Sequence, residues 1–361
     1  MKIAHVVSTF YPHQGGMGVV VYDEARALAQ HGHSVTVFTM RYPGDVEHEE
    51  RDGFSIQRLQ PMVRLGDGGI VRWRSRLDNF DVVHVHVPWY GAVSGVVAEC
   101  RRANKPLVAT IHMTGRPQGL VKKLFKYIDE KRAMRAIFSC AKKIFVVNKN
   151  YFLHSYQGAG QVSELPNPID TNIFTPGSVD RTIFGGLSSP GTKIILFVGN
   201  LMPIKRLDIL LRALVVGESD WRVAVVGDGY AENEYKKLAE ELGIARAVKF
   251  LGSVERIKLP VFYRSADVVV VPSETESFSL VAAEAMACGT SVIVSDVVGV
   301  RDRTLEGAIT FAPGDARDLA EKIAMVFEHS KNGSRRIAAS KIDFNLDKHI
   351  AELESVYRSV V

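Results

Sequence analysis

Two glutamates stand eight positions apart beside a short polar turn. Glu276 and Glu284 lie in PSETESFSLVAAEAMA, between the apolar runs VVVV and SVIVSD. The good helix formers of LVAAEAMA predict a helix that starts near Ser277. Glu276 would lie just before this helix and Glu284 two turns inside it, and eight residues turn about 80° beyond two full turns, so the two carboxylates would share a side of the element. Taken alone, the pair is more typical of a solvated helix face.

The same stretch also offers a place for an anion. A helix N-terminus presents unpaired N–H groups and the positive end of the helix dipole, which suits a diphosphate. Lys205 is a second candidate, because it follows the apolar run KIILFVG and a short loop and opens another predicted helix beside Arg206. A cation there opposes the helix dipole unless an anion balances it.

The elements that must position these residues alternate along the whole chain. Short apolar, β-branched runs are separated by helical segments, a pattern that predicts parallel, doubly wound α/β sheets. The segment 175–193 is rich in Gly, Pro and Ser, and we interpret it as an interdomain linker. We therefore expect two domains, over 1–178 and 190–344. Ligands of open parallel sheets bind beyond the carboxyl ends of the strands, so the expected site is a cleft between the domains.

Composition is consistent with two globular domains. The chain has 361 residues, of which 46% are hydrophobic and 24% charged. Cys100, Cys140 and Cys288 are too few and too scattered for a zinc site or a disulfide framework. The sequence shows neither a signal-peptide pattern nor an apolar run of membrane-spanning length. We therefore expect a cytoplasmic protein.

The positive charge is concentrated in one region. The net charge is +5, yet residues 72–143 contain fifteen Lys and Arg against five Asp and Glu. Such a region suggests an anionic partner. Within 120–143 we expect a basic amphipathic helix, which either packs its apolar side into the core or docks on an anionic membrane surface. No platform of aromatic side chains accompanies it, so nucleic acid is not expected. The apolar side would comprise Leu120, Leu124, Phe125 and Ile128, and the basic side Lys122, Lys123 and Lys126.

An ordered series of motifs resembles one family. FVGNLMPIKRLDILLRAL, AVVGDG and FLGSVERIKLPVFYRSADVVVVPSETESFSLVAAEAMACGTSVIVSD are similar to the nucleotide-sugar-binding domain of GT4-type retaining glycosyltransferases. QGGMG, GHSVTVFT, HVH, ATIH and NPIDTNIF precede them in the family's order. The resemblance covers nearly the whole chain. It implies the GT-B fold, in which two Rossmann-like domains face a cleft and the last helix, 345–361, packs back on the first domain.

The resemblance also implies an activity and residue roles. The chain would move a sugar from a nucleoside diphosphate sugar to an acceptor hydroxyl of a glycan, a lipid-linked molecule or a small molecule, with retention. Glu276 would contact sugar hydroxyls and Glu284 the ribose, which suits carboxylates that accept two hydrogen bonds. Lys205 would neutralise the leaving diphosphate, and His112, at the end of the apolar run PLVATIH, would lie near the reacting sugar. The expected donor site comprises Asn200, Lys205, Arg206, Glu276, Ser277, Phe278, Ser279, Leu280 and Glu284.

The sequence departs from the family at three places. Asn200 replaces the usual Arg, Ser279 a frequent Gly, and Val298-Gly299 the usual Gly-Gly. Arg206 could supply the missing charge, or Lys205 and the Asn200 amide could suffice. These departures keep open a catalytically silent protein that binds nucleotide sugars. A GT-B sugar-phosphate enzyme such as an epimerase is a further alternative, which would need no separate acceptor.

The first half contributes a glycine cluster and more histidines. Gly15, Gly16 and Gly18 would form a loop whose N–H groups approach a phosphate or the acceptor, although a turn cluster is more often structural. His84 and His86 alternate with valine and point to one face; we interpret them as structural or acceptor-side residues, since no third metal ligand is evident. No D-x-D pair is present, so no metal and no other cofactor is expected. The G-x-G-x-x-G spacing of a nicotinamide site is also absent.

Overall fold

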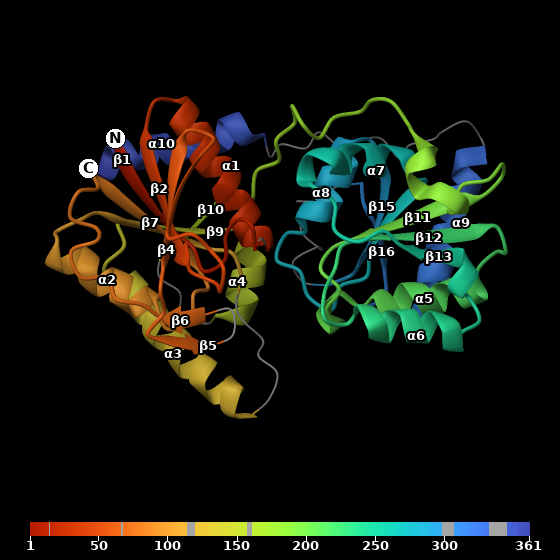
Figure 1. Ribbon diagram of the computed structural model, residues 1–361, viewed down its shortest axis with the longest axis horizontal. Coiled ribbons are helices and arrows are strands. Elements are labelled where there is room, and N and C mark those ends of the chain that lie inside the picture. Colours follow the sequence, from red (N-terminus) through yellow and green to blue (C-terminus); the bar gives the residue numbers. More distant parts are fainter. Residues whose placement is uncertain (14, 66–67, 114–119, 157–160, 298–306, 332–344) are drawn as a thin grey trace. The chain divides into compact units, whose positions relative to one another are not determined.

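The computed structural model divides the chain into two compact units (Figure 1). It describes residues 1–13, 15–65, 68–113, 120–156, 161–297, 307–331 and 345–361. The first unit comprises Met1–Pro168 with Phe344–Val361, and the second Ile169–Asp343. The division falls earlier than the expected boundary at 178. The reason is that Phe174 is buried in the second unit, with its ring centroid 6.1 Å from that of Tyr263.

The first unit is built on an eight-stranded sheet. The strand order is β10-β9-β8-β7-β1-β2-β4-β3, and all neighbours run parallel except β3, which pairs antiparallel with β4 at the edge. A separate hairpin joins β5 and β6. The strands are β1 Lys2–Val6, β2 Ser34–Met40, β3 His48–Arg51, β4 Phe54–Leu59, β5 Val63–Leu65, β6 Gly68–Ile70, β7 Val82–Val87, β8 Leu107–Ile111, β9 Lys143–Val146 and β10 Ser163–Glu164. The helices are α1 Gly16–Gln30, α2 Val93–Arg102, α3 Leu120–Phe138, α4 Lys149–Ser155 and α10 Leu346–Val360.

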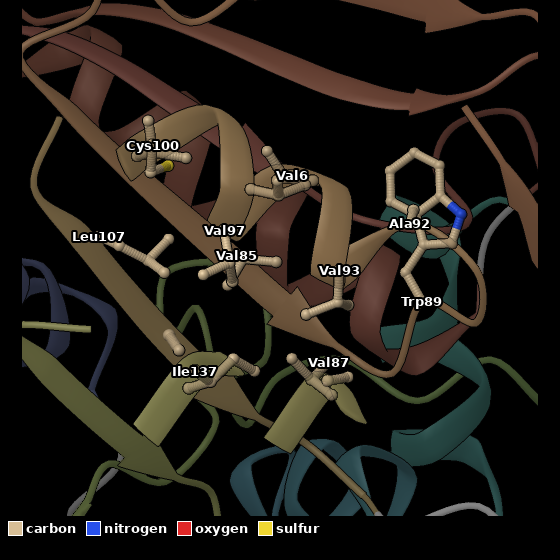
Figure 2. Close-up of a cluster of buried hydrophobic side chains, with 14 of the residues drawn as sticks. Val6, Val85, Val87, Trp89, Ala92, Val93, Val97, Cys100, Leu107 and Ile137 are labelled. Carbon is tan, nitrogen blue, oxygen red and sulfur yellow. The ribbon is translucent and has the colours of Figure 1, made fainter. Parts of the chain in front are cut away.

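Both faces of this sheet are covered. On one face, valines of β7 and their neighbours pack against α2 and α3 (Figure 2); each fully buried Val contributes about 1.5–3 kcal/mol relative to an exposed one. On the other face, α1 and α10 pack over β1, β2 and β7. The last helix thus returns to the first unit, where Ile350, Leu353 and Tyr357 are fully buried. Because successive residues of a strand point to opposite faces, His5, His84 and His86 belong to the α1/α10 face.

The second unit contains a six-stranded sheet that is parallel throughout. Its order is β13-β12-β11-β14-β15-β16. Helices α5, α6 and α9 bury their apolar sides against one face, and α8 packs against β14 and β15. The strands are β11 Lys193–Val198, β12 Trp221–Val226, β13 Val248–Phe250, β14 Val268–Val271, β15 Ser291–Ser295 and β16 Ile309–Phe311. The helices are α5 Leu207–Val216, α6 Glu232–Glu241, α7 Leu259–Ser265, α8 Leu280–Ala287 and α9 Ala316–Lys331.

The interpretation of 175–193 as a linker was wrong. This segment contains a 3₁₀ helix, Arg181–Leu187, that belongs to the second unit. Phe184 is fully buried and packs edge-on against Phe262 at 5.9 Å. Arg181 forms two hydrogen bonds of 3.0 Å to the carboxylate of Asp267. Gly185 and Gly186 therefore lie within a 3₁₀ segment that contains one buried aromatic side chain, and Pro190 and Gly191 form a turn after it.

Candidate functional site

Lys205 and Glu276 meet at the carboxyl ends of two neighbouring strands. Lys205 ends the 3₁₀ turn Pro203–Lys205 after β11, and Glu276 lies in the loop after β14. Lys205 Nζ donates a hydrogen bond of 2.7 Å to Glu276 Oε1. The backbone N–H of Glu274 also donates to the carbonyl of Ile204 at 2.9 Å. The two side chains are 34% and 13% exposed, so this ion pair stays within reach of a ligand.

Glu284 is held separately by two partners. It is buried in α8, where Oε1 accepts from Arg256 Nε at 3.1 Å and Nη2 at 3.0 Å, and Oε2 accepts from the Tyr263 hydroxyl at 2.9 Å. Burial, followed by the negative charge of Glu284, raises the pKa of Tyr263 well above its ordinary value. Sequence reasoning gave no role to Arg256 and Tyr263, although both lie within the quoted motif FLGSVERIKLPVFYRSADVVVV, because nothing in their local spacing pairs them with Glu284.

The expectation that the helix starts near Ser277 was wrong, so helical spacing does not place the two carboxylates on one side. Helix α8 begins at Leu280, so Glu276 precedes it and is not on its surface. Ser279 is the N-cap, with φ 66° and ψ 82°, and its Oγ accepts from the N–H of Ala282 at 3.4 Å. This left-handed conformation ends the preceding turn and prevents the helix from extending back to Ser277. It also explains why a glycine suits this position.

The remaining donor-site predictions fall around these two strand ends. Phe278 is buried, Ser277 and Leu280 are partly buried, and Asn200 is exposed directly after Gly199. Arg206 donates to Asp208 through Nε at 3.0 Å and Nη2 at 3.1 Å. Its charge is thereby balanced by a residue in the first turn of α5. Lys205 is thus the better candidate for a phosphate, while Val298 and Gly299 lie outside the described residues.

Glycines hold the loop after β11 in place. A Cβ at Gly227 would lie 2.1 Å from the carbonyl oxygen of Gly199, and one at Gly229 would lie 2.4 Å from that of Leu201. Leu201 N–H also donates to the Asp228 carbonyl at 2.7 Å. The glycines of GDG therefore let two loops pack backbone to backbone and so support the turn that leads to Lys205.

In the first unit, His112 follows β8 at the carboxyl edge of the sheet. It is 5% exposed, and its Nε2 lies 3.0 Å from Nδ1 of His86. Burial lowers the pKa of His112 to about 4, although the charge of Glu24 and a contact with Asn167 oppose that shift. The imidazole is therefore neutral at neutral pH.

The prediction that Gly15, Gly16 and Gly18 form a loop was wrong in part. Helix α1 begins at Gly16, Gly15 is its N-cap, and Gly18 lies in the first turn. A Cβ at Gly18 would lie 2.6 Å from the carbonyl oxygen of Thr9. Gly18 thus allows the helix to approach the preceding loop, while Gly15 and Gly16 remain at an N-terminus that can meet an anion.

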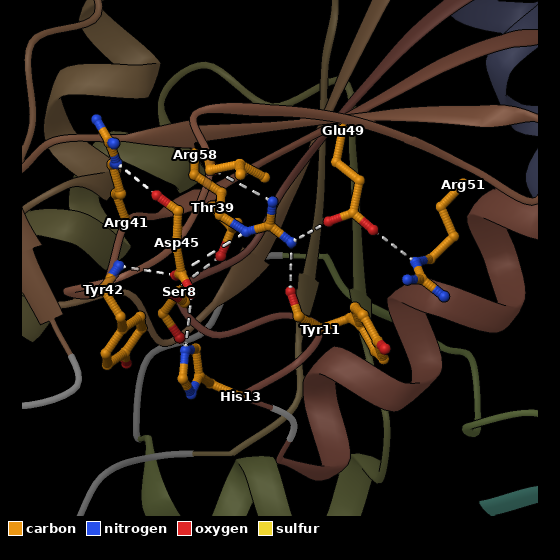
Figure 3. Close-up of polar contacts among 11 residues, drawn as sticks. Ser8, Tyr11, His13, Thr39, Arg41, Tyr42, Asp45, Glu49, Arg51 and Arg58 are labelled. Carbon is orange, nitrogen blue, oxygen red and sulfur yellow. Dashed lines mark hydrogen bonds and ion pairs between the residues drawn. The ribbon is translucent and has the colours of Figure 1, made fainter.

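Buried Arg58 fixes the loop that leads into α1 (Figure 3). Its Nη2 donates to the carbonyl of Tyr11 at 2.8 Å and to Glu49 Oε2 at 2.7 Å. His13 Nε2 contacts Asp45 Oδ1 at 3.0 Å. These bonds tie the segment before Gly15 to strands β3 and β4.

His84 and His86 are fully buried, next to two side chains that the sequence did not predict as their neighbours. His5 and Glu24 lie beside them, and one ligand atom from each of these four side chains falls within 4.8 Å of the others. The view that no third potential ligand is present was therefore wrong. The register of the sheet explains the gathering, because His5 is opposite His84 on the adjacent strand.

The basic helix is present as α3, but one predicted residue lies elsewhere. Ile128, expected on the apolar side, is 47% exposed next to Tyr127, which is 55% exposed. The buried residues of α3 are Ala133, Met134 and Ile137. The side chains of residues 120–126, which include the three predicted lysines, lie outside the described part. Among the helices of the described residues, none combines the length and apolar character that crossing a membrane requires.

Comparisons agree with this architecture. Several solved structures share the fold over almost the full length. Sucrose-phosphate synthase from Thermosynechococcus elongatus has a TM-score of 0.79 at 24% identity, covering 99% of this chain and 98% of that one. HepE of Anabaena, solved with UDP-glucose, has a TM-score of 0.79 at 19% identity, covering 99% and 100%. The fold is GT-B, with two Rossmann-like units.

Sequence comparison defines the family. The family described as "Glycosyl transferases group 1" matches residues 179–342, and "Glycosyltransferase Family 4" matches residues 14–173. A protein named D-inositol 3-phosphate glycosyltransferase from Mycolicibacterium smegmatis is 31% identical over 90% of this chain and 81% of its own length. One of the same name from Nocardiopsis dassonvillei is 30% identical over 96% and 90%. The chain belongs to the GT4-type group 1 glycosyltransferases.

Proposed function

We propose that this glycosyltransferase moves a hexose-type sugar from a nucleoside diphosphate sugar to an acceptor hydroxyl, with retention and without a metal ion. The observation that carries the proposal is the Lys205–Glu276 pair at the carboxyl ends of β11 and β14. A cation and a hydroxyl acceptor stand together where ligands of parallel sheets bind. Proteins of the same fold were solved with UDP and with UDP-glucose.

Each residue has a role that its chemistry allows. Lys205 exchanges Glu276 for the diphosphate and stabilises the charge that develops on the leaving group. The released carboxylate of Glu276 accepts sugar hydroxyls, and the carboxylate of Glu284 accepts a ribose hydroxyl. The first turn of α8 offers unpaired N–H groups to the phosphates. Lys205 and α8 thereby take the place of a metal ion.

The first unit is proposed to bind the acceptor, with His112 and the N-terminus of α1 contributing. The related proteins named D-inositol 3-phosphate glycosyltransferase suggest a polyol phosphate as one acceptor to assay. Sugars and lipid-linked acceptors belong in the same panel.

The test is transfer by the purified chain from UDP-, GDP- and ADP-sugars to these acceptors, with the product anomer read by NMR. We expect a retained anomer, equal rates with and without EDTA, and a fall of about 10²- to 10³-fold in kcat for Lys205→Ala. Glu276→Ala should be similarly impaired. Lys237→Ala is the matched control, because Lys237 is 75% exposed on α6. Equal rates in wild type, Lys205→Ala and Glu276→Ala would contradict the enzyme proposal.

A second candidate is a binding protein without transferase activity. Asn200 stands where the family has a cation, and Arg206 is committed to Asp208. Saturable binding of a nucleotide sugar with no transfer and no donor hydrolysis would favour this candidate.

We also propose that the region 120–143 docks on an anionic membrane surface, as a peripheral cytoplasmic enzyme would. Exposed Tyr127 and Ile128 on α3 support it, with Lys131 Nζ 4.3 Å from the Tyr127 ring centroid. Binding to anionic vesicles should weaken with salt. No binding at low salt, or binding unchanged by Lys122, Lys123 and Lys126→Glu, would contradict it.

A further inference from the structure

Buried polar side chains line the α1/α10 face of the first unit, and the proposed reaction uses only one of them. His5, His86 and His112 come from β1, β7 and the end of β8; we call them the histidine chain. His5 Nδ1 lies 2.9 Å from His86 Nε2, and His86 Nδ1 lies 3.0 Å from His112 Nε2. Glu24 of α1 and His349 of α10 cover the chain, and all five residues are buried.

In the pair that covers the histidine chain, Glu24 and His349, the carboxylate of Glu24 is ionised. His349 Nδ1 donates to the Pro166 carbonyl at 3.1 Å, since a carbonyl can only accept. His349 Nε2 lies 2.8 Å from Glu24 Oε1. Burial opposes ionisation of Glu24, but the hydrogen bond and charge of His349 lower its pKa to about 2. Glu24 Oε2 then lies unpaired, 3.7 Å from His5 Nδ1 and 3.6 Å from His86 Nε2.

Hydrogen-bond geometry couples the three rings. Each gap in the chain must hold one proton, because two N–H groups would clash at 3 Å and two bare nitrogens would repel each other. His86 is neutral, since burial lowers its pKa well below the ordinary value, so it carries one proton for two gaps. The rings therefore all carry their proton on Nδ1 or all carry it on Nε2.

The ends of the chain select between these two states. Within the described residues, no hydrogen bond of good geometry reaches His5 Nε2 or His112 Nδ1, although the Asn167 side chain lies close enough to His112 to affect its pKa. A buried N–H without an acceptor is rarer in proteins than an acceptor without a donor. When all three rings carry their proton on Nδ1, the unprotonated end nitrogen is Nε2 of fully enclosed His5. The N–H at the other end is then Nδ1–H of His112, beside the polar side chain of Asn167.

We propose that His5, His86 and His112 form a tautomer-coupled chain with all three protons on Nδ1, so that His112 offers an N–H donor, and not a base, to an oxygen atom of the bound substrate. The substrate contact rests on the proposed transfer reaction. The coupling rests on the free protein alone. His5 is thus a positioning residue for His112, acting through His86.

His84 lies against the chain without belonging to it. Its Nδ1 lies 2.6 Å from the Tyr357 hydroxyl and its Nε2 lies 2.7 Å from Thr110 Oγ1. A cation bound by His5, Glu24, His84 and His86 would displace these hydrogen bonds and the bond between His5 and His86. Metal occupancy is therefore a distinct outcome of the test.

The test is long-range ¹H–¹⁵N NMR of the full chain labelled with [¹⁵N]histidine, without substrate. We expect protonated Nδ1 and bare Nε2 on His5, His86 and His112. In His5→Phe, His86 Nε2 loses the donor that it accepts from, so the proton of His86 should move from Nδ1 to Nε2, towards Glu24, and His112 should change to the Nε2–H form. Thr110→Val is the matched control, because it should alter His84 and leave His112 unchanged.

Mixed tautomers in the wild type, Nε2–H on His112, or an unchanged His112 in His5→Phe would each overturn the coupling. So would stoichiometric zinc on the ring nitrogens of the purified protein. If His5→Phe does not fold, the wild-type spectrum still decides. The variants His112→Asn and His112→Gln then test the substrate contact. The amide N–H of Asn stands near the position of Nδ1–H, and the amide N–H of the longer Gln stands near the position of Nε2–H. Greater transfer by His112→Asn supports the contact, and greater transfer by His112→Gln overturns it without affecting the coupling.

Discussion

The second unit keeps its charged pair within reach of a ligand, whereas the first unit encloses its polar chain. Lys205 and Glu276 are 34% and 13% exposed, while His5, His86 and Glu24 are at most 1% exposed. An ion pair open to water contributes little to stability and can exchange partners. An enclosed network instead has one arrangement, set by packing. The difference suggests that the second unit is adapted for binding charge and the first for holding one side chain in a defined state.

The largest expected effect is a loss of stability at acidic pH, caused by the enclosed histidines. The pKa values of His5 and His112 are lowered by burial from 6.5 to about 4. As the pH falls from 6.5 to 4, the unfolded chain binds protons at these positions and the folded chain does not, so the free energy of unfolding decreases. At about 1.4 kcal/mol per pKa unit, the loss is several kcal/mol. The measurement is urea unfolding with hydrogen exchange in β7 and β8; equal stability at pH 7 and 4.5 would refute it.

Removal of Glu24 should have the next largest effect. Glu24→Ala leaves buried His349 without its partner and opens a cavity, for an expected loss of about 3–5 kcal/mol in the free energy of unfolding. Chemical denaturation of the variant measures this value. Glu352→Ala on α10 is a control, since Glu352 is exposed. Similar losses in both variants would remove the distinction between enclosed and exposed charges.

Tyr263→Phe tests an enclosed polar contact of the donor region. The variant removes the hydroxyl that donates to Glu284 Oε2 at 2.9 Å. Because Arg256 still pairs with the carboxylate, we expect a loss of about 1–3 kcal/mol in stability. Thermal unfolding measures it, and no change would show that the Tyr263 hydroxyl does not help to hold Glu284.

Ser279→Gly should have the smallest effect, and in the opposite direction. Left-handed backbone costs a residue with a side chain about 1–2 kcal/mol, and replacing a Ser cap by Gly costs a few tenths. We expect the free energy of unfolding to rise by about 1 kcal/mol, measured by urea denaturation. A loss of that size would mean that the Ser279 cap outweighs its strained conformation.

The sequence predicted the parts of these two regions that depend on neighbouring residues, and it did not predict contacts between residues far apart in the chain. Alternating apolar runs predicted both sheets, and the strand ends predicted Lys205 and His112 at their edges. The left-handed turn at Ser279 was not predictable, because the residues after it are good helix formers. Nor was the pair that covers the histidine chain, since His349 reaches Glu24 only when α10 returns across more than three hundred residues. Local patterns fix elements, whereas such partners depend on tertiary packing.

The most direct test of the central claim is calorimetric titration of UDP, GDP and ADP into the wild type, Lys205→Ala and Lys237→Ala. The account predicts that at least one nucleoside diphosphate binds the wild type and Lys237→Ala equally, and binds Lys205→Ala at least about tenfold more weakly, a difference of about 1.4 kcal/mol. Binding that is absent from the wild type, or equal in all three proteins, would contradict it.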